Sequence, residues 1–242
     1  MKKLILGLFC LSALNAMAVV NIYGPGGPAP VFKEIVENSP NSKDINLQFG
    51  PANKWMDSAK ENADIIFSGS DFMMNTFAGK LEDIDTSTIK AVRIREAGIL
   101  VRDGNPKKIK SVKDLAKKGV NIIAVDGAGQ ISLWEDMVGK SKDIKLLNEV
   151  RGNIKFFAPN SALALARWKE DSSIDAVIIW KPWEKRFTGS KFVRVEKENR
   201  IYRPASVALT KKGQNNPEAK ELYNKILSDD FNKIWDKHDW IK

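Results

Sequence analysis

The sequence predicts an α/β protein with largely parallel sheets, and two observations support this class. First, short apolar runs rich in β-branched and aromatic residues repeatedly end in a cluster of Gly, Pro, Ser or Asn and then continue as a helix-like segment. Second, strands that alternate with helices are typical of parallel sheets with helical crossovers. With 242 residues, 43% hydrophobic and 29% charged, the chain has the composition of a globular protein of one or two domains.

Four strand-to-helix junctions look suited to bind an anion. They lie within residues 19–37, 45–61, 63–77 and 120–139. In each, a buried-strand pattern gives way to turn residues at the point where a helix is expected to begin. The first N–H groups of such a helix have no intrahelical partner, and the positive end of its dipole points at the space above them. Several junctions converging on one crevice would form an oxyanion site from backbone amides and hydroxyls.

The first eighteen residues have the pattern of a secretory signal peptide. A basic start precedes an apolar stretch that ends in Ala16-Met17-Ala18, which predicts cleavage after Ala18. The apolar run is well short of the ~20 residues that span a bilayer. Cleavage would remove Cys10, the only cysteine, and with it any disulfide, thiolate nucleophile or Cys-based zinc site.

The rest of the chain continues the alternation of strands and helices. In chain order we expect a strand over 97–102, a turn over 103–106, an amphipathic helix beginning at Ser111, helices over 131–138 and 160–170, strands over 175–180 and 205–209, and a helical region over 216–235. The lysine-rich run 105–119 is interpreted as a solvated surface.

Two of these strands, 98–102 and 205–209, are the natural places for the chain to cross between two lobes. The sequence therefore predicts a first lobe of residues 19–99 plus 206–242 and a second lobe of residues 100–205, each within the usual size of a domain.

The residue types disfavour several functions. His238 is the only histidine, so we expect neither a His-based metal site nor a catalytic triad, and no cofactor. The formal net charge of +9 favours the approach of small anions. No basic patch is interleaved with stacking aromatics, which disfavours nucleic acid as a partner. Asp64, Asp71 and Asp126 lie at predicted strand ends, but no spacing pairs them with a second acid, so no enzyme activity is expected.

The sequence resembles the periplasmic solute-binding proteins of ABC transporters, in the branch of the molybdate- and sulfate-binding proteins, and within it the accessory colonization factor C group. The resemblance covers essentially the whole mature chain. Its main segments are YGPGGPAPVFKEI (23–35), ADIIFSGSD (63–71), GILVRDGNPKKIKSVKDLAKKGVNIIAVD (98–126) and ALALARWKEDSSIDAVIIW (162–180).

This resemblance implies the type II periplasmic binding protein fold, in which two mainly parallel sheets flanked by helices are joined by two hinge strands and close on a ligand. It also implies a monomer in the periplasm that delivers a small anionic ligand to an ABC permease or a chemoreceptor in the inner membrane.

Family members hold a tetrahedral oxyanion with neutral donors at helix N-termini, so the resemblance also implies a set of ligand-binding residues. By position they are Gly26, Gly27, Asn53, Ser68, Ser70, Gly127, Ala128, Gly129, Gln130 and Trp180. Trp180 stands where molybdate binders carry a tyrosine, and Gly26-Gly27 where they usually have a hydroxyl donor. These departures point away from molybdate and leave sulfate or an organic acid open.

Three hypotheses for the function follow. The favoured one is capture of a sulfate-like tetrahedral oxyanion. The second is capture of an organic acid, such as an aspartate-like amino acid, by an Arg–carboxylate pair. Arg102, Arg151 and Arg203 lie near the predicted cleft edges, although solvation at the surface is the expected fate of each. The third is an exported enzyme or a colonization or adhesion factor on the same fold.

Overall fold

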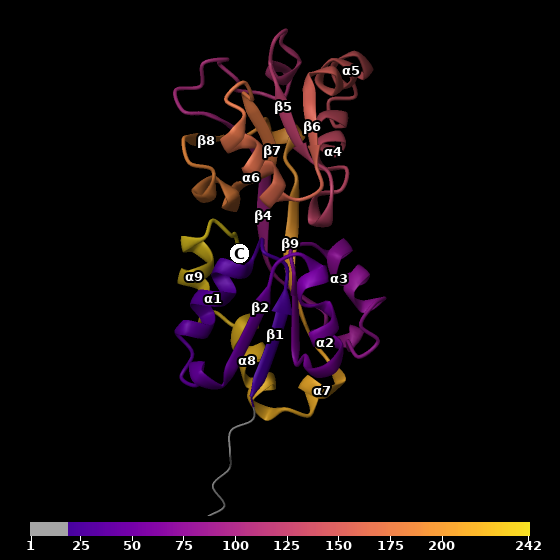
Figure 1. Ribbon diagram of the computed structural model, residues 1–242, viewed down its shortest axis with the longest axis vertical. Coiled ribbons are helices and arrows are strands. Elements are labelled where there is room, and N and C mark those ends of the chain that lie inside the picture. The colour runs from indigo at the N-terminus through magenta and orange to yellow at the C-terminus, as the bar shows by residue number, and fades with distance from the viewer. Residues whose placement is uncertain (1–18) are drawn as a thin grey trace, which may run out of the picture.

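The computed structural model describes residues 19–242, so the predicted signal peptide over residues 1–18 lies outside the described residues. The chain folds into two α/β lobes stacked along its long axis, and two long strands run between them (Figure 1). The predicted two-lobed α/β class is therefore confirmed. Within residues 19–242, no helix is long and apolar enough to cross a membrane.

The strands follow the hydrogen-bonded order β2-β1-β3-β9-β4-β7-β5-β6, with β8 paired to β4. Their bounds are β1 (Val20–Gly24), β2 (Ile45–Phe49), β3 (Ile65–Ser68), β4 (Lys90–Arg102), β5 (Ile122–Val125), β6 (Ile154–Ala158), β7 (Ala176–Trp180), β8 (Ser190–Val193) and β9 (Tyr202–Leu209). The α-helices are α1 (Ala29–Glu37), α2 (Met56–Asn62), α3 (Asp71–Ala78), α4 (Leu133–Gly139), α5 (Ile144–Asn153), α6 (Ser161–Glu170), α7 (Lys211–Gln214), α8 (Pro217–Leu227) and α9 (Asn232–Lys237). Short 3₁₀ turns include η2 (Ala52–Lys54), η4 (Lys113–Ala116), η5 (Ala128–Gln130) and η6 (Lys181–Arg186).

The first lobe is built on the parallel strands β2-β1-β3, with β9 antiparallel to β3. β1 and β3 are buried along their whole length, which explains their nearly continuous apolar sequences. In one core cluster, Phe32 stacks on Phe67 at 4.0 Å and meets Trp235 edge-on at 5.9 Å. In another, Trp55 meets Phe77 edge-on at 5.1 Å. This packing fixes the ends of β1 and β3 side by side.

The second lobe repeats this design with the parallel strands β7-β5-β6. The second half of β4 pairs antiparallel with β7, and β8 pairs antiparallel with β4. Its core includes Ile99, Ile123, Ile178 and Trp168, all buried. The ends of β5 and β7 therefore face the first lobe together.

β4 connects the lobes by changing its partner. Residues Lys90–Glu96 lie opposite β9, whereas Ala97–Val101 lie opposite β7. β4 begins at Lys90, seven residues before the predicted strand over 97–102, and β9 begins at Tyr202 rather than at residue 205. The lobe limits 19–99 plus 206–242 and 100–205 remain predictions.

Three further expectations need correction. Ser111 does not begin an α-helix, because its segment forms only the 3₁₀ turn η4; the Ser111 hydroxyl accepts from the Asp114 amide at 3.3 Å. The helix expected over 131–138 begins at Leu133, since Ser132 takes a left-handed conformation with φ of 57°. The C-terminal helical region is two helices, α8 and α9, and Pro217 lies in the first turn of α8.

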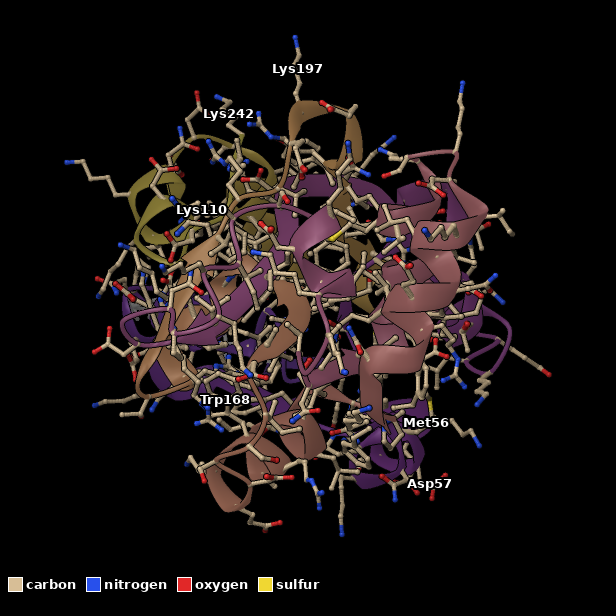
Figure 2. All side chains as sticks on the ribbon, turned by 90° about the horizontal axis from the view of Figure 1, so that it is seen from above. Met56, Asp57, Lys110, Trp168, Lys197 and Lys242 are labelled. Carbon is tan, nitrogen blue, oxygen red and sulfur yellow. The ribbon has the colours of Figure 1, made fainter. Side chains whose placement is uncertain are left out.

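The lysine-rich run 105–119 lies at the surface, as the sequence predicts. Its lysines are exposed, whereas Ile109, Val112 and Leu115 between them are buried in the second lobe. Seen along the long axis, Figure 2 shows another exposed lysine, Lys197, extending away from the body of the protein.

Candidate functional site

The loop from β1 to α1 faces the junction between the lobes. A Cβ atom added at Gly27 would lie 3.3 Å from Nη1 of Arg95, so this backbone passes close to that guanidinium. Pro28 caps α1 and offers no N–H group, which leaves few amide donors in the loop. The carbonyls of Gly26 and Gly27 accept hydrogen bonds from Arg186 of the second lobe, at 3.2 and 3.4 Å.

The loop from β3 to α3 places its two serines differently. The Ser70 hydroxyl oxygen accepts from the Met73 amide at 3.2 Å and caps α3, so its proton remains free to donate to another group. The Ser68 hydroxyl donates to the Ser70 carbonyl at 3.0 Å and is fully buried, so it serves the turn. The carbonyl of Gly69, between them, accepts from Nη2 of Arg95.

The loop from β5 to α4 brings the second lobe to the same place. A Cβ atom at Gly127 would clash with the carbonyl of Pro159, so only glycine fits there. Ala128 has a φ of 51°. A Cβ atom at Gly129 would lie 3.3 Å from the Ser70 hydroxyl oxygen and 3.2 Å from Nη2 of Arg95. The two lobes therefore touch at this point.

Two further candidates lie in the second lobe and carry unsatisfied polar atoms. Gln130 donates to the Ser161 hydroxyl at 2.6 Å, but its buried carbonyl oxygen has no hydrogen-bond partner within residues 19–242. Trp180 ends β7, is fully buried, and its indole N–H also lacks a partner within that range. Asn53, by contrast, is exposed on η2 and makes no contact with these groups that the structure records.

Arg95 of β4 lies where these loops converge. We call Arg95 together with Gly27, Gly69, Ser70, Gly129 and Trp180 the interlobe site. Its side chain is buried, with only 3% of the residue exposed, and its guanidinium carbon lies 4.4 Å from the centre of the Trp180 ring. Within residues 19–242 no carboxylate pairs with it, and its Nε has no hydrogen-bond partner. Burial, and secondarily the charge of Arg203, lower the pKa of Arg95 to about 9.

Two more arginines border the interlobe site. Arg203 of β9 lies 5.8 Å from the Trp180 ring centre, donates to the Gly129 carbonyl at 3.3 Å, and pairs with Asp136 at 2.9 Å. Arg186 of η6 stacks on Trp183 at 4.2 Å, and burial lowers its pKa. Within the described chain, Arg186 has no carboxylate at ion-pair distance.

Sequence reasoning missed Arg95 and Arg186, and the other two arginines it considered lie elsewhere. Arg102 stacks on Trp168 at 3.6 Å and donates to three backbone carbonyls at the end of α6. Arg151 is exposed and lies over Phe157. The available signal was an arginine at position 95, two residues before the apolar run 97–101. Residues 19–242 contain no cluster of three or more His, Cys, Asp or Glu that could hold a metal.

Two lobes on paired hinge strands, with loops and a buried cation meeting between them, define a two-lobed solute-binding protein. The chain belongs to the bacterial extracellular solute-binding protein family, whose model matches residues 20–240. The predicted resemblance to ABC-transporter binding proteins is therefore confirmed.

Solved structures agree with this assignment. The crystal structure of PEB3 bound to L-phospholactate is 35% identical, covers 92% of this chain and 99% of that chain, and has a TM-score of 0.85. Peb3 from Campylobacter jejuni is 34% identical over the same shares, with a TM-score of 0.84. The sulfate-binding protein SubI from Mycobacterium tuberculosis shares the fold, at 14% identity, with 92% of this chain and 86% of that chain covered and a TM-score of 0.75. Comparison with curated proteins gave no match.

Proposed function

We propose that this solute-binding protein captures a small organic acid with at least two negative charges, of the phosphorylated hydroxy-acid class, between its lobes. The observation that carries the proposal is Arg95, a buried guanidinium with no carboxylate partner within residues 19–242. Removing an ion from water costs several kcal/mol unless another charge compensates it. An anionic ligand at this position supplies that compensation.

The charge balance of the surroundings favours more than one negative charge on the ligand. Three guanidinium groups, those of Arg95, Arg186 and Arg203, border the junction between the lobes, and Asp136 is the one carboxylate paired with any of them in residues 19–242. Arginine presents a planar fork of donors that matches phosphate and carboxylate oxygens bidentately. A ligand with a phosphoryl and a carboxylate group would use two such forks.

Neutral donors support a tetrahedral group on that ligand. The Ser70 hydroxyl proton and the Trp180 indole N–H are both free, and α3 begins directly after Ser70. Donors at a helix N-terminus bind phosphoryl oxygens well. The predicted tetrahedral oxyanion and the predicted organic acid are thus combined in one ligand class.

The relatives support this choice of ligand class. PEB3, 35% identical over 92% of this chain, was crystallised with L-phospholactate. Membership of an extracellular family supports a periplasmic location, and the family supports delivery of the ligand to an ABC permease. We further propose a monomer that binds its ligand without turnover; delivery to a chemoreceptor is the alternative.

The test is a ligand panel measured by thermal shift and isothermal titration calorimetry. The panel contains L-phospholactate, phosphate, sulfate, molybdate, citrate and aspartate. A ligand at about 100 times its Kd adds about 2.7 kcal/mol to the free energy of unfolding. We expect phospholactate to raise Tm more than phosphate or sulfate at equal concentration. Sulfate or molybdate binding more tightly than phospholactate would favour the simple oxyanion instead, and a positive turnover assay without any stabilisation would favour an enzyme.

A further inference from the structure

The last residues of the chain return to the hinge. Ile241 and Ile94 of β4 exchange two backbone hydrogen bonds of 2.8 Å, and Trp240 is almost fully buried, with 2% exposed. In Figure 1 the C-terminus lies beside β4 at the junction of the lobes, away from the body of α8. The C-terminal residues thus form part of the wall behind the interlobe site.

Trp240 contacts the cation on which the proposed ligand depends. The guanidinium carbon of Arg95 lies 5.3 Å from the centre of the Trp240 ring and 4.4 Å from that of Trp180. One tryptophan comes from the C-terminus of the chain and the other from the second lobe. Arg95 is therefore held by two aromatic rings rather than by a carboxylate.

This arrangement has a chemical consequence for binding. A π-face attracts a cation through the ring quadrupole, but it accepts none of the five N–H donors at the edge of the guanidinium. A carboxylate partner would occupy those donors and compete with an incoming anion. Two aromatic rings stabilise the charge of Arg95 and leave its donors to the ligand, apart from the Nη2 group that donates to the Gly69 carbonyl.

Trp240 is itself fixed in place. Its ring meets that of Trp235 edge-on at 5.5 Å, and its amide donates to the Trp235 carbonyl at 3.1 Å. Trp235 packs in turn on Phe32 of α1. Asp239, with a φ of 60°, makes the turn that points the chain back to β4. The position of the Trp240 ring is thus set by the core of the first lobe.

We propose that Trp240 is a positioning residue for ligand binding, which holds the guanidinium of Arg95 against Trp180 in the orientation that meets the anion. This inference rests on the proposed function of the interlobe site. It predicts that the affinity for the anion depends on an aromatic ring at position 240, and that this dependence acts through Arg95.

The test compares Trp240→Leu and Trp240→Phe with the control Trp55→Leu. Trp55 is equally buried in the first lobe, but it packs on Tyr23 and Phe77 and not on Arg95. We expect both leucine variants to lower Tm, and only Trp240→Leu to raise the Kd for L-phospholactate, by about tenfold, the size of a desolvated cation–π contact. Trp240→Phe keeps a π-face and should restore most of the affinity, which also covers the case that Trp240→Leu does not fold.

A double-mutant cycle identifies the route of the effect. In an Arg95→Gln background, which removes the cation, the additional change Trp240→Leu should alter the Kd by less than about threefold, because the contact through which Trp240 acts is already lost. Equal losses of affinity in Trp240→Leu and Trp55→Leu, a full additive loss in the Arg95→Gln background, or no rescue by phenylalanine would each overturn the inference. Absence of phospholactate binding to the unaltered protein would instead overturn the proposed function, and this inference with it.

Discussion

Arg95 and Arg203 lie directly opposite each other in the antiparallel pairing of β4 with β9, the two strands that run between the lobes. Like charges at opposed positions of a sheet destabilise it. Asp136 pairs with Arg203 at 2.9 Å, but Glu96 is committed to Arg194 at 2.8 Å and Arg200 at 3.7 Å, so Arg95 has no carboxylate partner within residues 19–242. An anion bound beside both guanidinium groups would remove the repulsion between the two strands that connect the lobes.

Replacing Arg95 should affect binding and stability in opposite directions. Arg95→Gln removes the buried charge, so we expect the Kd for L-phospholactate to rise at least a hundredfold, given about 1.5–3 kcal/mol for each hydrogen bond to a charged group. The ligand-free protein should keep or raise its Tm, because an unpaired buried charge is lost. Calorimetric titration and thermal unfolding measure the two effects.

Arg102→Gln is the matched control for this change. Arg102 also stacks on a tryptophan, but it donates to backbone carbonyls of the second lobe. We expect a lower Tm and an unchanged Kd. A Kd that rises equally in both variants would show that the loss comes from general destabilisation rather than from the interlobe site.

The two serines of the β3–α3 loop should differ in their effects. Ser70→Ala removes a free hydroxyl donor beside Arg95 and the cap of α3, so both ligand affinity and the free energy of unfolding should fall, the latter by about 1 kcal/mol. Ser68→Ala removes only a hydrogen bond within the loop and should leave the Kd nearly unchanged. Calorimetry on both variants checks this, and a larger affinity loss in Ser68→Ala would contradict the assignment.

Ligand affinity should fall at high pH. The pKa of ligand-free Arg95 is lowered to about 9, and a bound anion raises it by favouring the charged form. Above about pH 9, binding therefore requires uptake of a proton, and the Kd rises by up to about tenfold per pH unit. Below that value Arg95 is charged in both states and adds no pH dependence. Calorimetric titrations with L-phospholactate from about pH 8 to about pH 10.5 measure the trend; a constant Kd over this range would contradict it.

The C-terminal turn should favour closure of the lobes. Asp239 pairs with Lys181 at 3.3 Å and Lys185 at 2.9 Å, both on η6 of the second lobe. Because the pairs are partly exposed, each is worth at most about 1 kcal/mol. Asp239→Asn should therefore weaken phospholactate binding by about two- to fivefold and enlarge the radius of gyration measured by small-angle scattering at subsaturating ligand.

An ion pair on the surface of a single helix provides the control for the Asp239→Asn variant. Glu221 pairs with Lys225 inside α8, and Glu221→Gln should change neither the affinity nor the radius of gyration. Equal effects of Glu221→Gln and Asp239→Asn would contradict a role of the C-terminal turn in closure.

Local patterns in the sequence predicted the strand-to-helix junctions well. β1 and β3 are buried on both faces and read as continuous apolar runs. The helix expected over 160–170 is α6, which Asn160 caps by accepting from the Leu163 amide at 3.0 Å. Because parallel strands end at one edge of a sheet, the predicted glycine and serine loops meet at the interlobe site.

The first half of β4 and its Arg95 could not be predicted from local sequence patterns. The first half of β4 carries Arg93, Arg95 and Glu96, all buried, in a pattern that is typical of an exposed segment. Their burial depends on the pairing with β9, more than a hundred residues later in the chain, and on Trp240. An arginine before an apolar run does not by itself predict these non-local contacts, so the sequence pointed to neutral donors, whereas Arg95 lies where the loops converge.

The most direct test of whether Arg95 binds the ligand is a crystal structure of the protein with L-phospholactate. We expect the phosphoryl or carboxylate oxygens within about 3 Å of the guanidinium nitrogens of Arg95 and Arg203, with the Ser70 hydroxyl or the Trp180 indole N–H as a further donor. We also expect Arg95 to exchange its bond to the Gly69 carbonyl for the anion. Ligand bound elsewhere, or between the lobes with Arg95 still on the Gly69 carbonyl and without contact to the anion, would contradict it.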